Sequence, residues 1–298
     1  MSILAVGSVA LDTIRTPQGK GKDVLGGSAT YFSISASFFS CVNLVAVVGR
    51  DFPPKYSRLL KKRGINLGGL VIKEGKTFRW GGEYGWDFGN PKTLFTHLNV
   101  FSKFDPKIPQ EYKKSKYLFL ANIDPRIQER VLKQLNPKLV ACDTMNYWIQ
   151  NKRNYLLRLL KKIDIFLLNE SEARMLTYQY SIVGAAKALI KLGPKIVIIK
   201  RGEHGSLLFS DRYIFSIPAF LLETIVDPTG AGDTFAGGLV GYLAQCNKFN
   251  QLNLKRAVVY GAVMATFAVE DFSVNRLLVI NLSDIKRRFK EFQRLSCF

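Results

Sequence analysis

Histidine is nearly absent from this sequence, which contains only His97 and His204. Neither residue lies in a spacing typical of metal ligands or of a catalytic triad, so histidine-based chemistry has little support. The four cysteines form no Cys-x-x-Cys pair: Cys41, Cys142, Cys246 and Cys297. This pattern argues against a zinc site and against a disulfide framework. We expect reduced, mostly buried cysteines, and catalytic groups of other residue types.

Long apolar runs are also missing. No run approaches the roughly 18 residues that are needed to cross a bilayer. Residues 1–8 lack the charged start and the apolar stretch of a signal peptide. We therefore expect a cytoplasmic protein with no membrane partner.

Acidic residues are scarce, with 23 Asp and Glu against 43 Lys and Arg, for a formal charge of +20. Such an excess suits a nucleic-acid partner, a polyanionic small substrate or a solvated basic surface. The basic clusters lie far apart, mostly at the ends of predicted helices: residues 61–63, 113–114, 161–162 and 286–288. Cations at helix ends suit the helix dipole, so this distribution favours the solvated surface.

What the sequence does contain is an alternation of short apolar runs and amphipathic stretches. The runs predict strands at residues 3–6, 44–48, 117–120, 139–141, 163–168 and 196–199. The stretches predict helices at residues 29–39, 56–63, 127–135, 154–162, 183–192, 231–244, 254–269 and 283–295. This order predicts an α/β fold with a central, mostly parallel sheet flanked by helices.

Residues 68–101 depart from that rhythm. Glycines alternate there with aromatic residues, among them Trp80, Tyr84, Trp86 and Phe88. The pattern predicts short antiparallel strands with tight turns. We interpret the segment as a small β-sheet lid inserted in one domain of residues 1–298, with an edge hairpin of the main sheet as the alternative.

The strongest chemical signal is the run from Asp227 to Asp233, Asp-Pro-Thr-Gly-Ala-Gly-Asp, which opens a predicted helix. Small residues at a helix start leave backbone N–H groups free, and these groups with the helix dipole stabilise a phosphate. Gly230 and Gly232 permit close approach of the phosphate to the backbone. Asp233 in the first turn can accept a proton from an attacking hydroxyl. As a structural alternative, Asp233 is a helix cap within an ordinary turn.

This run resembles the C-terminal signature of the ribokinase-like, or PfkB, carbohydrate kinase family, and it fills every position of that signature. The resemblance implies transfer of the γ-phosphate of ATP to a hydroxyl group of a sugar or sugar-like molecule. By the same resemblance, Asp233 is the catalytic base, and the amides of Gly230, Ala231 and Gly232 form the anion hole. Thr229 would contact the nucleotide together with Gly230 and Gly232.

Two N-terminal blocks match the acceptor site of this family. Asp12 follows the first predicted strand, and Gly26 and Gly27 precede the first predicted helix. A carboxylate accepts hydrogen bonds from a polyol, and glycines let backbone N–H groups reach sugar oxygens. We expect all three residues to bind substrate, although each also fits an ordinary turn.

Asn169 and Glu172 follow the predicted strand 163–168 with an Asn-x-x-Glu spacing. The resemblance implies a role near Mg²⁺, where an amide and a carboxylate can orient waters on a hard cation. The same spacing is typical of a helix capping box.

Lys200, Arg201, Gly202 and Gly205 follow the predicted strand 196–199. They resemble the nucleotide-binding turn of the family, in which cations neutralise phosphates and glycines form the turn. The sequence does not show which of the two cations points inward.

Asp143 and Asn146 end another strand, where many family members have an Asn-Pro segment. We expect them near the phosphate or the acceptor. The cofactors implied are ATP and Mg²⁺. The alternatives are a nucleoside kinase of this fold and, more remotely, a non-catalytic nucleic-acid-binding or regulatory protein. We also expect a homodimer formed through the lid, and no nucleic-acid partner.

Overall fold

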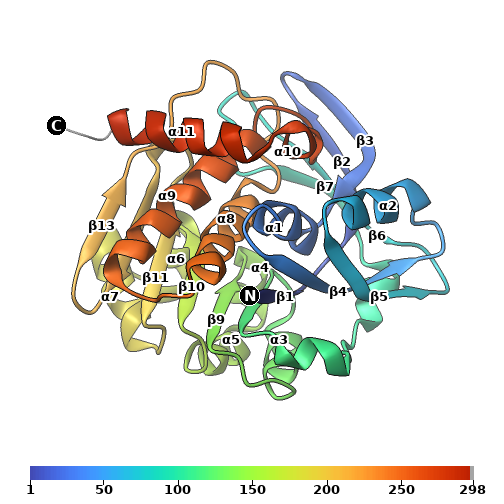
Figure 1. Ribbon diagram of the computed structural model, residues 1–298, viewed down its shortest axis with the longest axis horizontal. Coiled ribbons are helices and arrows are strands. Elements are labelled where there is room, and N and C mark those ends of the chain that lie inside the picture. Colours follow the sequence, from blue (N-terminus) through green and yellow to red (C-terminus); the bar gives the residue numbers. More distant parts are fainter. Residues whose placement is uncertain (296–298) are drawn as a thin grey trace.

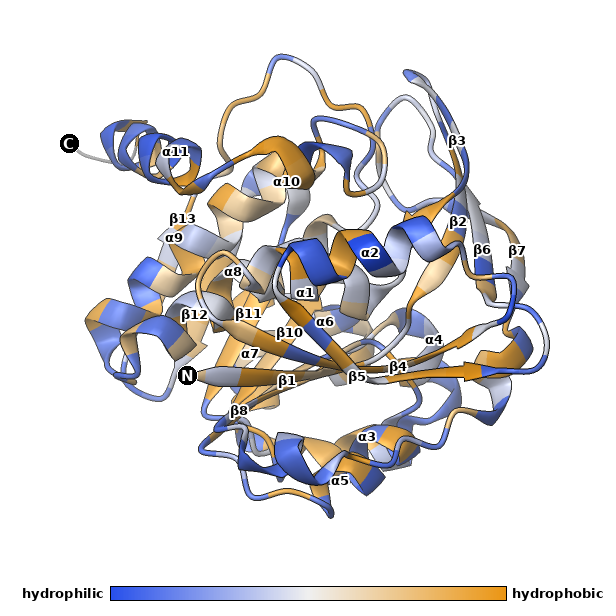
Figure 2. Ribbon diagram, turned by 45° about the vertical axis from the view of Figure 1, so that its right-hand side comes forward, coloured by the Kyte–Doolittle hydropathy of each residue, from blue (hydrophilic) through white to orange (hydrophobic). Residues whose placement is uncertain are grey.

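The computed structural model describes residues 1–295. A nine-stranded sheet lies between two groups of helices, and a four-stranded sheet stands at its side (Figures 1 and 2). From edge to edge, the large sheet consists of β13 (Ile214–Ile217), β12 (Ser206–Ser210), β11 (Ile196–Lys200), β10 (Ile165–Asn169), β9 (Leu139–Asp143), β8 (Tyr117–Leu120), β1 (Ser2–Val6), β4 (Cys41–Gly49) and β5 (Ile65–Lys73).

The large sheet is parallel from β5 to β11, and only β12 and β13 run antiparallel to their neighbours. Its central strands are short apolar runs because helices cover both of their faces. All four residues of β8 are buried, for example. The predicted fold class, a mostly parallel sheet flanked by helices with a small separate sheet, is confirmed.

Helices cover both faces of the large sheet (Figure 2). One face carries α1 (Ser28–Ala36), α2 (Pro54–Lys62), α8 (Ala231–Cys246), α9 (Gln251–Ala268), α10 (Asn275–Val279) and α11 (Leu282–Leu295). The other carries α3 (Pro125–Leu132), α4 (Asn146–Asn151), α5 (Arg153–Leu160), α6 (Glu170–Thr177) and α7 (Ile182–Lys191). Short 3₁₀ turns lie at Asn99–Lys103, Gln110–Lys114 and Gly202–His204.

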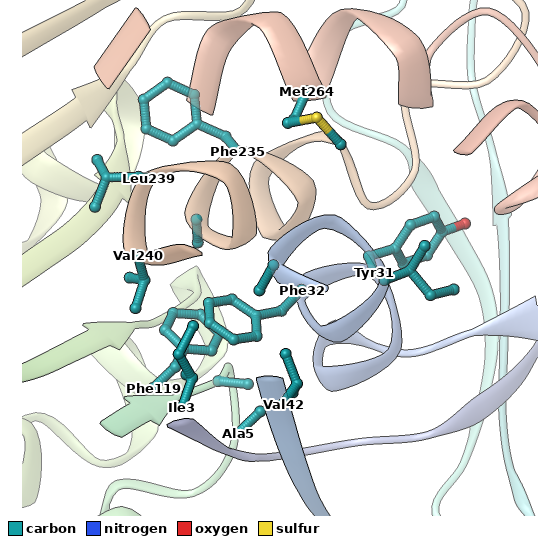
Figure 3. Packing of buried hydrophobic residues seen from close by; sticks show 14 of the residues in the cluster. Ile3, Ala5, Tyr31, Phe32, Val42, Phe119, Phe235, Leu239, Val240 and Met264 are labelled. Carbon is teal, nitrogen blue, oxygen red and sulfur yellow. The ribbon is translucent and has the colours of Figure 1, made fainter. Parts of the chain in front are cut away.

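Two apolar clusters fill the spaces between the sheet and these helices. In the first cluster, Phe32 of α1 stacks on Phe119 of β8, with ring centroids 3.8 Å apart. Figure 3 shows this pair beside Val240 of α8, whereas Tyr31 leaves α1 in another direction. The packing fixes α1 and α8 against the same strands. It therefore sets the position of residues 227–233, the glycine-rich loop, which leads into α8.

The small sheet has the order β3 (Gly19–Gly26), β2 (Ala10–Thr16), β6 (Phe78–Glu83) and β7 (Lys92–His97). Residues 68–101 therefore supply only two of its strands. Residues 68–73 belong to β5 instead, where a Cβ on Gly69 would lie 2.7 Å from the Leu44 carbonyl oxygen. The glycines that suggested tight turns thus allow β5 to pack closely on β4. β2 and β3 were missed because their residues are less aromatic.

Arg79 connects the small sheet to the large one. It forms an ion pair with Asp23 within the small sheet and a second ion pair, at 3.0 Å, with Asp51, which follows β4. Asp51 also accepts hydrogen bonds from the backbone N–H and the hydroxyl of Thr77, at 2.6 and 2.7 Å. Thr77 in turn accepts a bond from the Gly49 N–H at the end of β4. The small sheet is therefore joined to β4 by a short polar chain.

The cysteines only partly match their prediction. Cys142 is buried, but Cys41 is exposed and Cys246 is intermediate, and all three are free. Cys41 is exposed because it opens β4 at the solvent end of the sheet; Cys297 lies outside the described residues. Across residues 1–295, no helix has the length and apolar character to span a bilayer.

Candidate active site

Four neighbouring strands end at one cavity beside the start of α8. Because β8, β9, β10 and β11 are parallel and adjacent, their carboxyl ends meet at one edge of the sheet. The residues that line the cavity are Asn122, Asp143, Thr144, Met145, Asn169, Glu172, Lys200, Gly232 and Asp233. The fold thus brings Asn122 and Asp233, which are 111 positions apart in the sequence, to the same cavity.

The glycine-rich loop forms one wall of this cavity. Gly230 precedes α8 with a φ of 75°, a left-handed conformation that glycine adopts without strain. A Cβ at this position would also lie 2.4 Å from the ring of Tyr31. The Ala231 N–H donates to the Pro228 carbonyl oxygen at 3.2 Å. The amides at the start of a helix have no intrahelical acceptor, so those of Gly232 and Asp233 suit an anion.

Asp233 stands among like charges. Burial raises the pKa of its carboxyl group; Asp143 and Glu172 raise it further, and only Lys200 opposes them. Part of the side chain remains accessible from the cavity. A carboxyl group with a raised pKa at the start of a helix is suited to accept a proton.

Lys200 is the cation that reaches the cavity. Its Nζ lies 2.7 Å from Asp143 Oδ2, and a Cβ on Gly232 would lie 3.0 Å from Nζ. Burial lowers the pKa of Lys200, but Asp143 and Glu172 outweigh this effect, so the net direction is upward. Arg201 instead pairs with Glu170 at 2.7 Å and is absent from the lining. The charge of Lys200 is therefore held next to the glycine-rich loop.

Asn169 and Glu172 form the capping box at the start of α6. The Asn169 side chain accepts the Glu172 N–H at 2.8 Å, and the Glu172 carboxylate accepts the Asn169 N–H at 2.7 Å. Both residues nevertheless line the cavity. Burial raises the pKa of Glu172 to about 7. Capping and contact with a cation are thus compatible here.

Asp12 lies on β2 in the small sheet, not at the end of β1 as its place in the sequence suggested. Its side chain is 4% exposed. One carboxylate oxygen fills the space that a Cβ on Gly26 would need, at 1.8 Å. Burial raises the pKa of Asp12 to about 8, although the Gly27 amide lowers it and Asp227 and Asp233 raise it. The structure therefore brings Asp12, Gly26 and Gly27 together, with Asp12 in the electrostatic field of Asp233.

Six further predicted residues are absent from the cavity lining: Thr229, Gly230, Ala231, Gly202, Gly205 and Asn146. Gly202 opens the 3₁₀ turn after β11 and Gly205 directly follows that turn, with φ of 54° and 82°. Asn146 is exposed at the start of α4, where its side chain accepts the Tyr147 N–H at 2.8 Å. Asp143 and Asn146 were expected near the phosphate or the acceptor; Asp143 lines the cavity, whereas Asn146 is absent from the lining.

Sequence reasoning missed several residues of the site. Asn122 follows β8 at the same sheet edge as Asp143, so its strand-end position was an available signal. Thr144 and Met145 directly follow a predicted residue. Tyr31 had no such signal, and Tyr84 was noted only as an aromatic residue of the segment 68–101, because their contacts with the glycine-rich loop join segments that are distant in sequence.

The fold and the site suit a phosphotransferase of the ribokinase-like class: strand-end carboxylates and a lysine lie beside a glycine-rich helix start. A family model described as pfkB family carbohydrate kinase matches residues 2–279. The chain belongs to the pfkB carbohydrate kinase family. It is therefore a kinase that acts on hydroxyl groups of sugar-like or nucleoside substrates, rather than a non-catalytic protein on this fold.

A curated relative agrees with this membership, and two solved structures share the fold. The cytidine kinase of Thermococcus kodakarensis is 33% identical over 270 residues, which cover 86% of this chain and 95% of the relative. The nucleoside kinase of Burkholderia thailandensis in complex with inosine has a TM-score of 0.79 at 19% identity, covering 97% and 98% of the two chains. The ribokinase of Cryptococcus neoformans in complex with ADP has a TM-score of 0.76 at 19% identity, covering 97% and 99%.

Proposed function

We propose that this protein transfers the γ-phosphoryl group of ATP to a hydroxyl group of a nucleoside, with Asp233 as the general base. One observation carries the proposal: Asp233 and Gly232 at the start of α8 line the same cavity as Lys200. A proton acceptor, an anion hole and a cation are the protein groups that phosphoryl transfer requires.

In the proposed reaction, Asp233 accepts the proton of the acceptor hydroxyl as its oxygen attacks the γ-phosphorus of ATP. The bond from the γ-phosphorus to the β,γ-bridging oxygen breaks, and ADP leaves. Because burial raises the pKa of Asp233, its carboxylate is more basic than an exposed one. The gain in basicity favours proton transfer from a hydroxyl.

The amides of Gly232 and Asp233 would stabilise the charge on the transferring group. Lys200 supports this role, because its Nζ borders Gly232 while it also pairs with Asp143. A fixed ammonium in a partly dehydrated site stabilises developing negative charge more strongly than it would in water. We assign Lys200, rather than Arg201, to the phosphates.

The donor set of the cavity fits Mg²⁺. Asp143, Glu172 and Asp233 are hard oxygen donors and outnumber the single ammonium of Lys200. Residues 1–295 contain no group of three or more His, Cys, Asp or Glu side chains arranged to hold a metal ion alone. We therefore propose that Asn169 and Glu172 would orient the waters of a Mg²⁺ ion bound together with ATP. When bound, Mg²⁺ supplies positive charge at the phosphates.

A row of side chains on the small sheet favours a nucleoside as the acceptor. Paired residues of adjacent strands share one face, and Val24, Asp12, Trp80 and Thr96 are successive partners across all four strands. Trp80 is thus the cross-strand neighbour of Asp12. A Cβ on Gly82 would lie 2.2 Å from the Trp80 ring, so the ring occupies the space over that glycine. An aromatic plane beside the hydroxyl-binding carboxylate suits an acceptor that carries a base.

Two comparisons support this acceptor class. The relative at 33% identity is a cytidine kinase, and one solved structure of this fold holds inosine. The second candidate is a sugar without a base, which the family description itself favours.

A screen of ATP consumption separates the two candidates. Purified protein is assayed with ATP and Mg²⁺ against pyrimidine and purine nucleosides, ribose, other sugars, sugar phosphates and polyols. We expect the highest kcat/KM with a nucleoside and formation of its monophosphate. A higher kcat/KM with a free sugar would replace the nucleoside proposal by the second candidate.

A further inference from the structure

The glycine-rich loop touches the small sheet through a pair of hydroxyl groups. Thr229, the residue before Gly230, donates from Oγ1 to the hydroxyl oxygen of Tyr84 at 3.2 Å. Tyr84 directly follows β6, and its backbone N–H donates to the Arg15 carbonyl oxygen at 2.8 Å. Tyr84 is therefore fixed to the small sheet by its backbone and to the loop by its side chain.

Tyr84 is poorly placed for any other role. Its side chain is only 9% exposed. Burial raises its pKa far above the working range, with Asp227 and Asp12 adding to the effect. The phenol thus stays neutral and keeps its hydrogen at any physiological pH, so it is neither a base nor a pH sensor. What remains is a fixed polar contact with Thr229.

A second connection joins the same loop to another strand of the small sheet. The Ser273 N–H donates to Asp227 Oδ2 at 3.1 Å, and the Ser273 hydroxyl donates to the Leu25 carbonyl oxygen on β3. Ser273 is buried and has a φ of 58°, a conformation that a non-glycine residue adopts at a cost. Asp227 also accepts the Thr229 N–H at 2.9 Å. The loop is therefore held to β3 on one side and to the end of β6 on the other.

These connections bear on the anion hole. Thr229 is separated from Gly232 by only two residues, and Gly230 between them is confined by the ring of Tyr31. A shift of Thr229 would thus change the direction of the amides at the start of α8. We propose that Tyr84 is a positioning residue, which couples the placement of the small sheet over the acceptor to the alignment of the anion hole. The inference rests on the proposed function and adds to it a link between the two substrate sites.

The link predicts how catalysis changes when the contact is lost. Tyr84→Phe removes the hydroxyl and keeps the ring, so the acceptor and ATP should still bind with KM values within about twofold of wild type. The phosphoryl group would be less well stabilised in the transition state, and kcat should fall roughly 10-fold, as expected for one lost hydrogen bond. The acceptor-independent hydrolysis of ATP should fall by a similar factor, since it depends on the same anion hole.

A double-mutant cycle tests the proposal. We would measure kcat, both KM values, acceptor-independent hydrolysis and the melting temperature of Tyr84→Phe, Thr229→Val and the double variant. If the two hydroxyls act as a unit, the double variant loses about as much kcat as either single variant. Thr229→Ser retains the hydroxyl and should restore most of kcat. Tyr213→Phe is the matched control, because its buried hydroxyl lies on the distant β12–β13 turn.

Different outcomes distinguish the positioning role of Tyr84 from the proposed kinase function. A roughly 100-fold loss in the double variant, an unchanged kcat in Tyr84→Phe, or a loss confined to KM would overturn the positioning role while leaving the kinase proposal intact. Wild-type protein that consumes no ATP with any nucleoside or sugar would overturn the proposed function, and the positioning role with it.

Discussion

The ammonium of Lys200 lies 2.7 Å from the carboxylate of Asp143, at the point where β11 and β9 end. Both side chains border the cavity that Asp233 and Glu172 also line. A buried cation shared by several carboxylates sets their relative basicities. The pair therefore links the charge of the phosphate site to the proton affinity of the proposed base.

Loss of the carboxylate of Asp233 should abolish proton transfer selectively. Asp233→Asn keeps the size of the side chain, and turnover should fall by about 10² to 10⁴, as is typical for removal of a general base. ATP binding, measured by calorimetry, should remain close to that of wild type because the loop amides are unchanged. Near-normal turnover would exclude Asp233 as the base.

Removal of the charge of Lys200 should shift the pH dependence of the reaction. Lys200 lowers the pKa of Asp233 in the native protein. In Lys200→Met that pKa rises, so the acidic limb of kcat/KM should move to higher pH. Arg201→Met is the matched control and should leave the limb in place, because Arg201 pairs with Glu170 instead.

Lys200→Met also leaves Asp143 buried without its ion pair, which should cost about 3 to 5 kcal/mol of stability. Lys200→Arg therefore serves as a second variant that retains the charge. An acidic limb that does not move in a folded Lys200→Met protein would contradict the electrostatic role.

Asp12 should make the protein less stable as the pH rises. Its pKa is raised from 3.8 to about 8 on folding, so the folded state holds a proton that the unfolded state has released. The stabilisation by this proton is complete below about pH 4. It falls by about 1.4 kcal/mol per pH unit as the pH rises from there, and it is lost once the pH has passed about 8. Asp12→Asn should thus melt at a higher temperature than wild type at pH 8 and at a similar one at pH 4.

Asp211→Asn is the control for Asp12→Asn, because the Asp211 side chain is 75% exposed. Its melting temperature should follow that of wild type at both pH values. A pH-independent difference between Asp12→Asn and wild type would mean that the Asp12 carboxylate is already ionised in the folded protein.

Replacement of Glu172 should weaken the response to magnesium. Glu172→Gln preserves the capping interaction with Asn169 but removes a negative charge from the cavity. The concentration of free Mg²⁺ needed for half-maximal activity should rise several-fold. Glu170→Gln is the control, since Glu170 pairs with Arg174 and Arg201 outside the cavity lining. An unchanged Mg²⁺ response in Glu172→Gln would assign Glu172 to capping alone.

Trp80 should matter for acceptors with a base and not for free sugars. Trp80→Leu removes the aromatic plane, and stacking of one base contributes about 1 to 3 kcal/mol. The kcat/KM for the preferred nucleoside should fall by about 10-fold or more, while activity towards ribose stays constant. Trp86→Leu controls for the loss of an indole, because Trp86 is 85% exposed. Equal losses with both acceptors would remove Trp80 from base recognition.

Much of this architecture follows from local patterns. The strand Tyr117–Leu120 has the bounds predicted from its apolar run, and the helices from α1 to α11 that were predicted differ from the structure by a few residues at their ends. The strand-end motifs at Asp143, Asn169 and Lys200 converge because parallel strands share a carboxyl edge. The periodicity of apolar residues and the order of the elements along the chain are sufficient to predict such features.

Other features depend on contacts that no local pattern encodes. Asp12 was expected at the end of the first strand, yet it lies on a strand that pairs in parallel with β6, some 68 positions later. The inward direction of Lys200 is set by Asp143, and that of Arg201 by Glu170. Thr229 and Tyr84 are 145 positions apart. These relationships appear only when the chain has folded.

The bond from Ser273 to the Leu25 carbonyl oxygen spans 248 positions of the chain. While the protein is being synthesised, the ribosome releases Leu25 and Asp12 long before Asp227 and Ser273. The two halves of the site therefore cannot assemble until nearly the whole chain has emerged, and contacts of such long sequence separation form slowly. A nascent chain that stalls before residue 227 carries the proposed acceptor-side residues but lacks the proposed phosphate-binding loop, so we expect it not to consume ATP.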